Sequence, residues 1–205
     1  MRRSIFQHAV ALSEAGHELV LLGDYVDNGP RPNDAGFLRE VFTFAQDVNA
    51  TLLVGNHDLA YLYPERHDYR KSGYEPRGAK AIERVYAQFR EHFRVAYKQD
   101  HIVCSHAGFS RQFVELIHGR YGVSSPAEVV NLVNADDLPE TTYCGPANDG
   151  RDAIDGPMWL RLPQYDGCWQ QERILQVAGH SSQSTIRFRK NLMMIDVRLP
   201  LLLEW

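Results

Sequence analysis

The alternation of short apolar runs with amphipathic helical patterns is the feature that most constrains the fold of this chain. Each run is too short to be a buried helix, and each is followed by polar or turn-forming residues, which is typical of strands in a layered α/β architecture. The helical patterns lie between the runs, so the sequence predicts an α/β fold. The five runs cover residues 17–24, 50–58, 100–108, 173–181 and 191–197.

Four helices are expected from spacing and capping residues. The first covers roughly residues 2–15 and stops at Gly16, and the second is capped by Asn33 or Asp34. A third helix is expected around residues 77–93. The fourth begins at Ser125, where Pro126 and Glu128 complete the pattern of a capping box. Residues 135–157 are rich in Asn, Asp, Gly and Pro and are expected to form a loop.

Length and composition exclude several classes of protein. With 205 residues, of which 44% are hydrophobic, the chain fits one domain over residues 1–205. With a net charge of −4 and only the short basic cluster "RFRK", the sequence lacks the basic surface that is typical of nucleic-acid binding. No apolar stretch is long enough to span a membrane, and the N-terminus lacks the apolar block of a signal peptide. Cys104, Cys144 and Cys168 cannot all form disulfides with one another. A cytoplasmic protein with reduced thiols is therefore expected.

Four of the runs end in a small residue followed by a metal-ligand type of side chain. Asp24 follows Gly23, Asn56 follows Gly55, His106 follows Ser105 and His180 follows Gly179. Each residue alone has an ordinary explanation as a turn, cap or buried histidine. Ligands in open α/β sheets bind at the carboxyl ends of strands, so one convergent pocket explains all four together.

The chemistry of this set favours a divalent metal. One carboxylate, one amide oxygen and two imidazoles suit Mn, Fe or Zn rather than soft copper. Asp27 and His57 lie beside two of these ligands in sequence, and a carboxylate that accepts from an imidazole orients the ring and favours its protonated form. The pair is therefore predicted to act as the general acid for a leaving group, and the whole set indicates phosphoester hydrolysis.

The motifs "GDYVDNGP", "GNHD", "SHAG" and "AGHS" resemble, in this order and spacing, those of the calcineurin-like metallophosphoesterase superfamily. The resemblance covers residues 18–198 and is nearest to the phosphoprotein phosphatase and diadenosine-tetraphosphatase branch. It implies a sandwich of two β-sheets flanked by helices, and hydrolysis of phosphomonoesters or phosphoanhydrides by metal-bound hydroxide. It also implies two metal ions, with manganese expected first and iron or zinc as alternatives. Asp24 would bridge both ions, and Asn56, His106 and His180 would complete one site.

The sequence departs from the family pattern at its beginning. The family opens with a strand that ends in Asp-x-His, and those side chains hold the other metal, whereas this sequence starts in the helix that follows. The chain is therefore expected to lack its first strand, to bind one ion at the four ligands and to bind the second weakly. A coding region that continues upstream of Met1 would explain the difference.

The substrate is expected to be a phosphorylated protein or a nucleotide-type molecule. Arg161, in "GPMWLR", matches the family's segment before the last metal-binding histidine and is predicted to bind phosphate, as a bidentate guanidinium can. Asn28 stands where phosphatases have a phosphate-binding arginine, so Arg31 or Arg161 is expected to compensate. The tyrosine- and arginine-rich segment 61–78 could contact substrate or be an exposed loop without that role. The alternative to an enzyme is a catalytically deficient protein that binds a phosphorylated ligand on the same scaffold.

Overall fold

The computed structural model describes residues 3–27, 33–70, 73–135, 138–145, 150–152, 154–161, 167–171 and 173–197. The chain divides into two compact units with the boundary between Phe93 and Arg94. Two β-sheets flanked by α-helices confirm the predicted α/β class. The expectation that residues 1–205 form one domain stays a prediction, and each unit is described below by itself.

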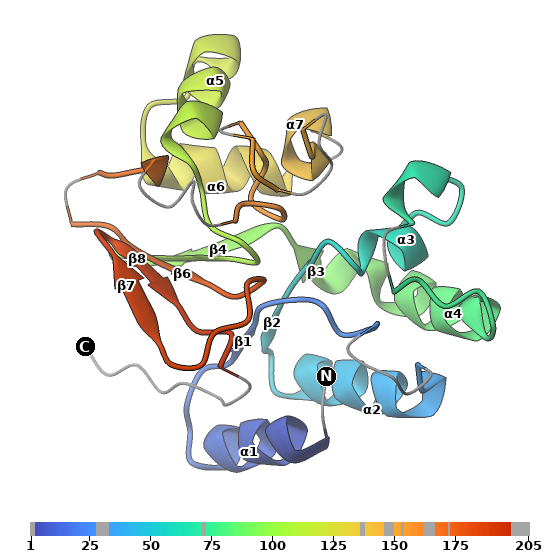
Figure 1. The fold of residues 1–205 in the computed structure, drawn as a ribbon. Coiled ribbons are helices and arrows are strands. Elements are labelled where there is room, and N and C mark those ends of the chain that lie inside the picture. Colours follow the sequence, from blue (N-terminus) through green and yellow to red (C-terminus); the bar gives the residue numbers. More distant parts are fainter. Residues whose placement is uncertain are drawn as a thin grey trace. The chain divides into compact units, whose positions relative to one another are not determined.

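The first unit contains a small sheet with the strand order β1-β2-β3, and helices follow β1 and β2 (Figure 1). Strands β1 and β2 are parallel, with Val20 opposite Thr51 and Leu21 opposite Leu52. Helix α2 begins after Asp34, whose side chain accepts from the Phe37 amide, so the expected cap is confirmed. The elements are α1 (Arg3–Glu14), β1 (Val20–Leu21), α2 (Ala35–Asp47), β2 (Thr51–Leu53), α3 (Leu59–Leu62), η1 (His67–Tyr69), α4 (Ala79–Phe89), η2 (Arg90–His92) and β3 (Phe93–Arg94).

Aromatic side chains form the core of the first unit. The ring of Phe42, on α2, is fully buried and contacts the rings of Tyr25, Tyr86, Phe89 and Phe93 at centroid distances of 5.1–5.6 Å. These contacts are edge-on, the arrangement that the ring quadrupoles favour. Because they join α2 and α4 to the segment after β1, they fix the position of the loop that carries Asp24 and Asp27.

The second unit is built on a five-stranded sheet in the order β4-β5-β6-β8-β7. The central strands β5, β6 and β8 are parallel, and the outer strands β4 and β7 run antiparallel to their neighbours. The elements are β4 (Ala96–Gln99), β5 (Ile102–Ser105), α5 (Arg111–Tyr121), α6 (Pro126–Asn134), α7 (Pro139–Thr142), β6 (Leu175–Ala178), β7 (Arg187–Arg189) and β8 (Leu192–Met194).

Helices α5 and α6 lie together on one side of this sheet (Figure 1). Phe109, Phe113 and Ile117 from the α5 region pack with Val129 and Val133 of α6 against Ala96 and Val103 of the sheet. Gln176, on β6, is 1% exposed, and its amide group bonds to the backbone of Phe109 and Trp169. This buried polar contact ties the start of α5 to the centre of the sheet and so to the strand ends that carry His106 and His180.

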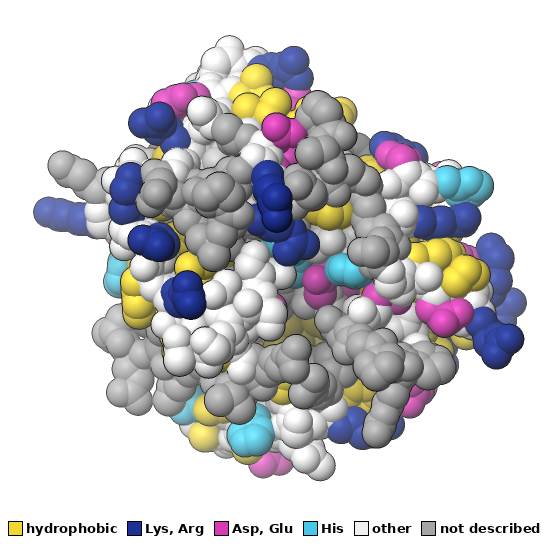
Figure 2. All heavy atoms as spheres, viewed as in Figure 1, with side chains coloured by type: hydrophobic (Ala, Val, Ile, Leu, Met, Phe, Trp, Pro, Cys, Tyr) yellow, Lys and Arg dark blue, Asp and Glu magenta, His cyan; other side chains and the backbone are white. Residues whose placement is uncertain are grey.

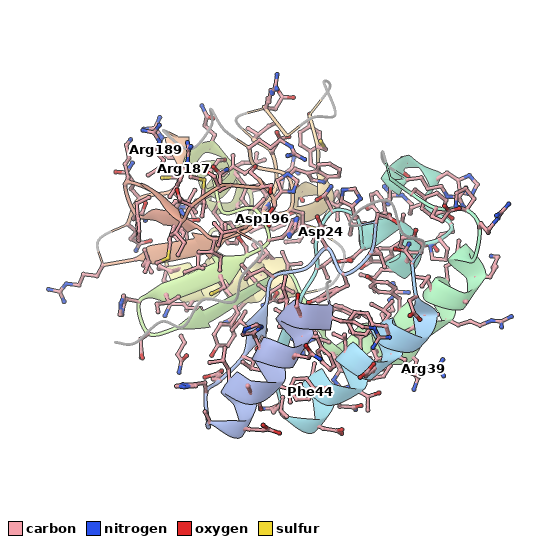
Figure 3. All side chains as sticks on the ribbon, turned by 60° about the horizontal axis from the view of Figure 1, so that its bottom comes forward. Asp24, Arg39, Phe44, Arg187, Arg189 and Asp196 are labelled. Carbon is pink, nitrogen blue, oxygen red and sulfur yellow. The ribbon has the colours of Figure 1, made fainter. Side chains whose placement is uncertain are left out.

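Several elements differ from those expected. The four predicted helices are present, and the capping box of α6 is formed by Ser125 and Glu128. The predicted loop at 135–157 contains the short helix α7, because Pro139 begins a turn that Leu138 and Thr141 close. Helix α5 and strands β4 and β7 were not predicted. Arg187, Phe188 and Arg189 of β7 are all exposed, so the apolar signal of a strand is absent there (Figure 3).

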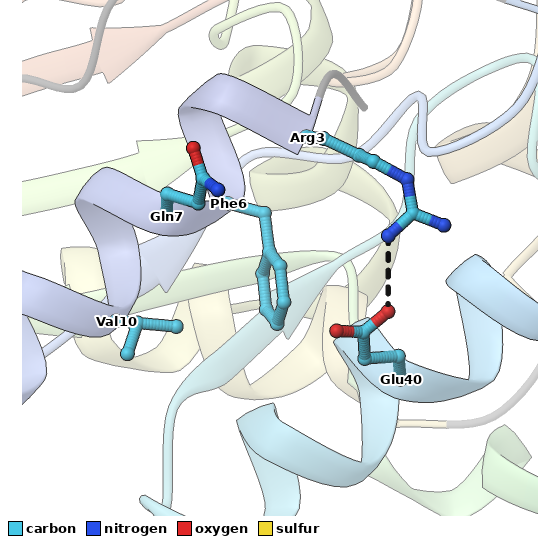
Figure 4. A pocket seen from close by; sticks show the side chains of 5 residues that line it. All are labelled: Arg3, Phe6, Gln7, Val10 and Glu40. Carbon is cyan, nitrogen blue, oxygen red and sulfur yellow. Dashed lines mark hydrogen bonds and ion pairs between the residues drawn. The ribbon is translucent and has the colours of Figure 1, made fainter.

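A shallow pocket of about 300 Å³ lies between α1 and α2 of the first unit (Figure 4). It is lined by Arg3, Phe6, Gln7 and Val10 of α1 and by Glu40 of α2, and an ion pair joins Arg3 to Glu40 at 3.4 Å. None of the residues predicted to bind metal or substrate is among those that line it. Both ends of the ion pair are exposed, so it contributes little to stability.

The described surface carries charges of both signs. On the face seen in Figure 2, Lys and Arg side chains occur in several separate places, with Asp and Glu between them. Among the described helices, none combines the length and the apolar character that crossing a bilayer requires.

Candidate metal centre and acid pair

Asp24 follows β1 after Leu22 and Gly23, and its backbone lies close to Gly55 in the turn after β2 (Asp24 is labelled in Figure 3). One carboxylate oxygen of Asp24, Oδ1, accepts a hydrogen bond from the amide of His57 at 3.0 Å. A Cβ atom on Gly55 would overlap the carboxylate and amide of Asp24, so only glycine permits this approach. Asn56, in the same turn, is 2% exposed. The first unit therefore brings the "GD" and "GNHD" motifs together.

Asp58 holds this arrangement in place. Its side chain is fully buried and accepts from the backbone amides of Asp24, Tyr25 and Gly55 at 2.8–2.9 Å. The hydroxyl of Tyr86, on α4, also donates to it, at 2.6 Å. Burial, followed by the Asp58 carboxylate, raises the pKa of Tyr86, so its hydroxyl remains a donor. Asp58 thus joins both motif loops to α4.

Asp27 and His57 lie beside each other, as predicted. The distance from Asp27 Oδ2 to His57 Nδ1 is 3.8 Å, and the carboxylate of Asp27 is only 2% exposed while the imidazole is 22% exposed. The other oxygen of Asp27 accepts from the Asn33 amide at 2.8 Å and from the Tyr61 hydroxyl at 2.9 Å. The Asp27 carboxylate is therefore buried and held in one orientation, whereas the His57 imidazole reaches solvent.

The surrounding charges favour a protonated His57. Burial alone would lower the pKa of His57, but its interaction with Asp27 and the nearby carboxylates of Asp24 and Asp58 raise the pKa above its ordinary value. A protonated imidazole that is partly exposed and backed by a buried carboxylate is suited to donate a proton to an incoming group.

The second unit brings the two predicted histidine ligands together. His106 follows β5 and is 2% exposed, and His180 follows β6. The amide of Gly179 donates to the carbonyl of His106 at 2.8 Å, which fixes the two strand ends side by side. His106 Nε2 and His180 Nδ1 are 3.1 Å apart, and the Trp159 ring lies 6.3 Å from that of His180.

This separation fits two ligands of a single metal ion. Imidazole nitrogens bind zinc-like ions at about 2.0–2.1 Å. Two such bonds place the nitrogens about 2.9 Å apart at a right angle and about 3.4 Å apart at a tetrahedral angle. The observed 3.1 Å lies between these values. The oxygens of Asp24 and Asn56 are of the type that the same ions accept, so the donor set fits a divalent cation.

Left-handed backbone conformations occur at three of the candidate positions. Asp24, Asp27 and His180 have φ angles of 55°, 58° and 63°. Such conformations cost free energy in residues other than glycine and gather at functional sites, because the surrounding contacts must hold them. This supports a functional reading of the loops after β1 and β6.

The phosphate-binding predictions have different outcomes. Arg161 is half-buried, and its amide donates to the carbonyl of Gly150, while its guanidinium forms no hydrogen bond or ion pair with the residues that the structure describes. Arg31 and Asn28 lie outside the described residues. Cys104 is buried within β5, which confirms its expected place in the core.

Sequence reasoning missed the residues that hold the site. No role at the site was predicted for Asp58 or Tyr86. Tyr61 was included only in the segment 61–78 that could contact substrate or be an exposed loop, and Asn33 was expected only as a helix cap. Asp58 ends the "GNHD" motif, and a carboxylate directly before a short helix is a common cap. The structure shows no such cap, because Asp58 binds the neighbouring loop instead.

A model of the calcineurin-like phosphoesterase family matches residues 3–190 of the chain. No curated protein matches. A crystal structure of the cold-active protein-tyrosine phosphatase of a psychrophilic Shewanella species is 19% identical, with a TM-score of 0.55 over 88% of this chain and 60% of that one. A second structure of a cold-active protein tyrosine phosphatase is 18% identical, with a TM-score of 0.55 over 88% and 59%.

The chain belongs to the calcineurin-like phosphoesterase family. This membership supports a metal-dependent phosphoesterase in general terms. At these identities the two solved structures show a shared fold, and the chain spans about 60% of the length of each.

Proposed function

We propose that the protein hydrolyses phosphomonoesters, with His57 as the acid that protonates the leaving group. The observation that carries this proposal is the acid pair itself. The partly exposed His57 imidazole, backed by the buried Asp27 carboxylate, has a raised pKa and lies next to Asp24 in the first unit. A protein that only binds a phosphorylated ligand has no need of such an acid.

We further propose that Asp24 and Asn56 bind a divalent ion together with His106 and His180. The family membership and the donor types support this assignment. When bound, such an ion supplies Lewis-acid activation of water and neutralises charge on the phosphoryl oxygens. Asp24, fixed by the His57 amide and Asp58, offers an oriented carboxylate, while neutral Asn56 adds an oxygen without further negative charge against an anionic substrate.

The source and destination of each proton in the reaction can then be stated. Water adds to phosphorus as the bond to the leaving oxygen breaks, and that oxygen takes the proton from His57. One proton of the water stays on the phosphate product, and the other passes to solvent and balances the proton that His57 regains for the next turnover. Asp27 stabilises the protonated imidazole beforehand and orients it through Nδ1, which leaves Nε2 to face the leaving group. The titles of the two similar structures name protein tyrosine phosphatases, so a phosphorylated tyrosine side chain is the substrate to test first. Phosphorylated serine or threonine and phosphoanhydrides of nucleotides are the alternatives.

The test compares His57→Asn with the control His67→Asn, which changes an exposed histidine of the same unit. His57→Asn should lower kcat by about 100-fold or more on phenyl phosphate, whose leaving group needs a proton. It should lower kcat much less on 4-nitrophenyl phosphate, and metal content should stay unchanged. The control should match the wild type.

Equal losses on the two substrates would show that His57 does not protonate the leaving group. A wild-type protein that binds inorganic phosphate but turns over neither ester, with any of manganese, iron or zinc, would favour the alternative of a phospho-ligand binding protein.

A further inference from the structure

Tyr61 is a buried residue whose hydroxyl has every bonding position occupied. It lies on α3 and is 1% exposed. The hydroxyl donates to Asp27 Oδ1 at 2.9 Å, and it accepts from the Asn33 side-chain amide at 3.0 Å and from the Glu75 backbone amide at 3.3 Å. A hydroxyl offers one donor and two acceptor positions, so these three contacts use all of them.

The first consequence concerns the orientation of Asp27. Its Oδ1 accepts from both Tyr61 and Asn33, and its own amide donates to Asn33 Oδ1 at 2.8 Å. With one oxygen held by two donors, the carboxylate cannot turn, and Oδ2 remains directed at the His57 ring. The Tyr61 hydroxyl bonds to Asp27, and Asp27 faces His57, so the effect of Tyr61 on the imidazole passes through Asp27.

The second consequence concerns the segment that passes over the acid pair. A Cβ atom on Gly73 would lie 3.5 Å from Asp27 Cβ and 3.6 Å from His57 Cε1, which is van der Waals contact with both. Gly73 has a φ angle of 98° and is exposed. Two residues on, Glu75 binds Tyr61 through its amide, and the Tyr74 ring packs on that of Tyr61 at 5.2 Å.

The chemistry of this segment suits an aromatic group. Tyr74 is half-buried, and the guanidinium of Arg70 lies over its ring at 5.1 Å. The proton of His57 goes to the leaving oxygen, so the leaving group must lie beside the imidazole. Gly73 borders the imidazole, and Tyr74 and Glu75 continue the same segment, so this segment is the part of the chain that the leaving group would meet.

We propose that Tyr61 is a positioning residue with two roles. It fixes the orientation of the Asp27 carboxylate, and it holds residues 73–75 in place as the surface that contacts an aromatic leaving group. This inference rests on the proposed function of His57. It assigns to one hydroxyl both the alignment of the acid and the placement of the surface that selects the substrate.

The experiment uses Tyr61→Phe, which removes the hydroxyl but keeps the ring and its packing. The control is Tyr97→Phe, because the Tyr97 hydroxyl bonds to Gln99 within the second unit, whereas the acid pair belongs to the first unit. Tyr61→Phe should lower kcat on phenyl phosphate by about 10-fold and on 4-nitrophenyl phosphate by about 3-fold or less. Metal content and inhibition by inorganic phosphate, which has no leaving group, should not change.

A double-mutant cycle shows whether Tyr61 acts through Asp27. In the Asp27→Asn background, Tyr61→Phe should lower kcat by no more than about twofold, because the carboxylate that it positions is already gone. A loss as large as in the wild-type background would overturn the positioning role. So would a loss in inhibition by inorganic phosphate equal to the loss in turnover, because it would indicate general damage.

A structural readout keeps this inference separable from the proposed function. Amide hydrogen exchange over residues 73–78 should speed up in Tyr61→Phe and not in Tyr97→Phe, since the Glu75 amide loses its acceptor. Unchanged exchange rates in Tyr61→Phe would refute the proposal that the Tyr61 hydroxyl holds this segment in place. If the wild type hydrolysed neither ester, the proposed function would fail, and this exchange measurement would still decide whether Tyr61 holds the segment.

Discussion

Asp58 shows how a single carboxylate can organise two loops. Its oxygens accept from three backbone amides and from the Tyr86 hydroxyl, and the group is fully buried. Two of these amides, of Asp24 and Tyr25, lie in the loop after β1, and the third, of Gly55, lies in the loop after β2. Asp58 therefore joins the two loops, and the position of Asp24 depends on it. Buried donors that lose their acceptor cannot be satisfied by water.

We expect Asp58→Ala to lower the free energy of unfolding by roughly 3 kcal/mol, because it leaves several buried donors without an acceptor. Asp68→Ala is the control, because Asp68 is exposed and paired with Arg66 at the surface. Denaturant unfolding measures both variants. A loss below about 1 kcal/mol for Asp58→Ala would mean that the amides find other acceptors.

The pair Asp27 and His57 could be predicted from sequence, but the residues that hold it could not. Each member of the pair stands next to a recognisable ligand in a short motif. Tyr61 and Asn33 act on Asp27 from 34 and 6 positions away, and a tyrosine in an apolar stretch is indistinguishable from an ordinary core residue. Only the fold shows that its hydroxyl faces a carboxylate.

At the scale of the element, α6 is the helix whose start is best defined. Ser125 accepts from the Glu128 amide, and the Glu128 carboxylate accepts from the amides of Ser124 and Ser125. These bonds to backbone amides lower the pKa of Glu128 to about 2. The helix contributes Val129 and Val133 to the core of the second unit, so its cap affects how that core is held.

Ser125→Ala should lower the free energy of unfolding by about 1 kcal/mol at pH 7, through the loss of the cap. The contribution of Glu128 has a defined pH dependence. Its pKa is lower in the folded than in the unfolded protein, so the stabilisation is present above the unfolded value of about 4.3 and is lost as the pH falls toward 2.

Thermal unfolding of the wild type and Glu128→Gln as a function of pH measures this effect. The difference in Tm should be largest near neutral pH and should vanish near pH 2. A difference that stays constant over this range would show that the charge of Glu128 is not involved in capping.

The helices were easier to predict than the strands because caps and periodicity are local signals. Helices α2 and α6 carry both, whereas α1 and α4 were recognised from the periodicity of their apolar residues. Strand β7 carries neither, because its three residues are exposed and it exists only by pairing with β8. Helix α5 begins at the cap residue Ser110, but no capping partner of the Glu128 kind follows it.

At the scale of the whole molecule, the family match covers residues 3–190, a range that contains all four of the proposed metal ligands. Metal removal is therefore the change that should affect the whole chain. Binding to the folded state alone stabilises a protein by an amount that grows with the ratio of free metal to Kd, and reaches about 2.7 kcal/mol at 100 times Kd.

A chelator should lower both the Tm and the phosphatase activity, and added manganese, iron or zinc should restore them. His106→Ala should reduce metal content and make the Tm insensitive to the chelator, because it removes a strong imidazole ligand. His101→Ala, at an exposed turn position just before β5, is the control. Unchanged metal stoichiometry in His106→Ala would remove this residue from the ligand set.

The left-handed backbone at Asp24, Asp27 and His180 places selection for stability and selection for chemistry in opposition. Glycine would adopt these φ angles without strain, so the backbone strain at each position would be relieved if its side chain were lost. A library of variants screened only for thermal resistance would therefore be expected to discard the very residues proposed to carry the reaction. The backbone strain at these three residues is a cost to stability, and the requirements of folding alone do not explain why the sequence keeps them.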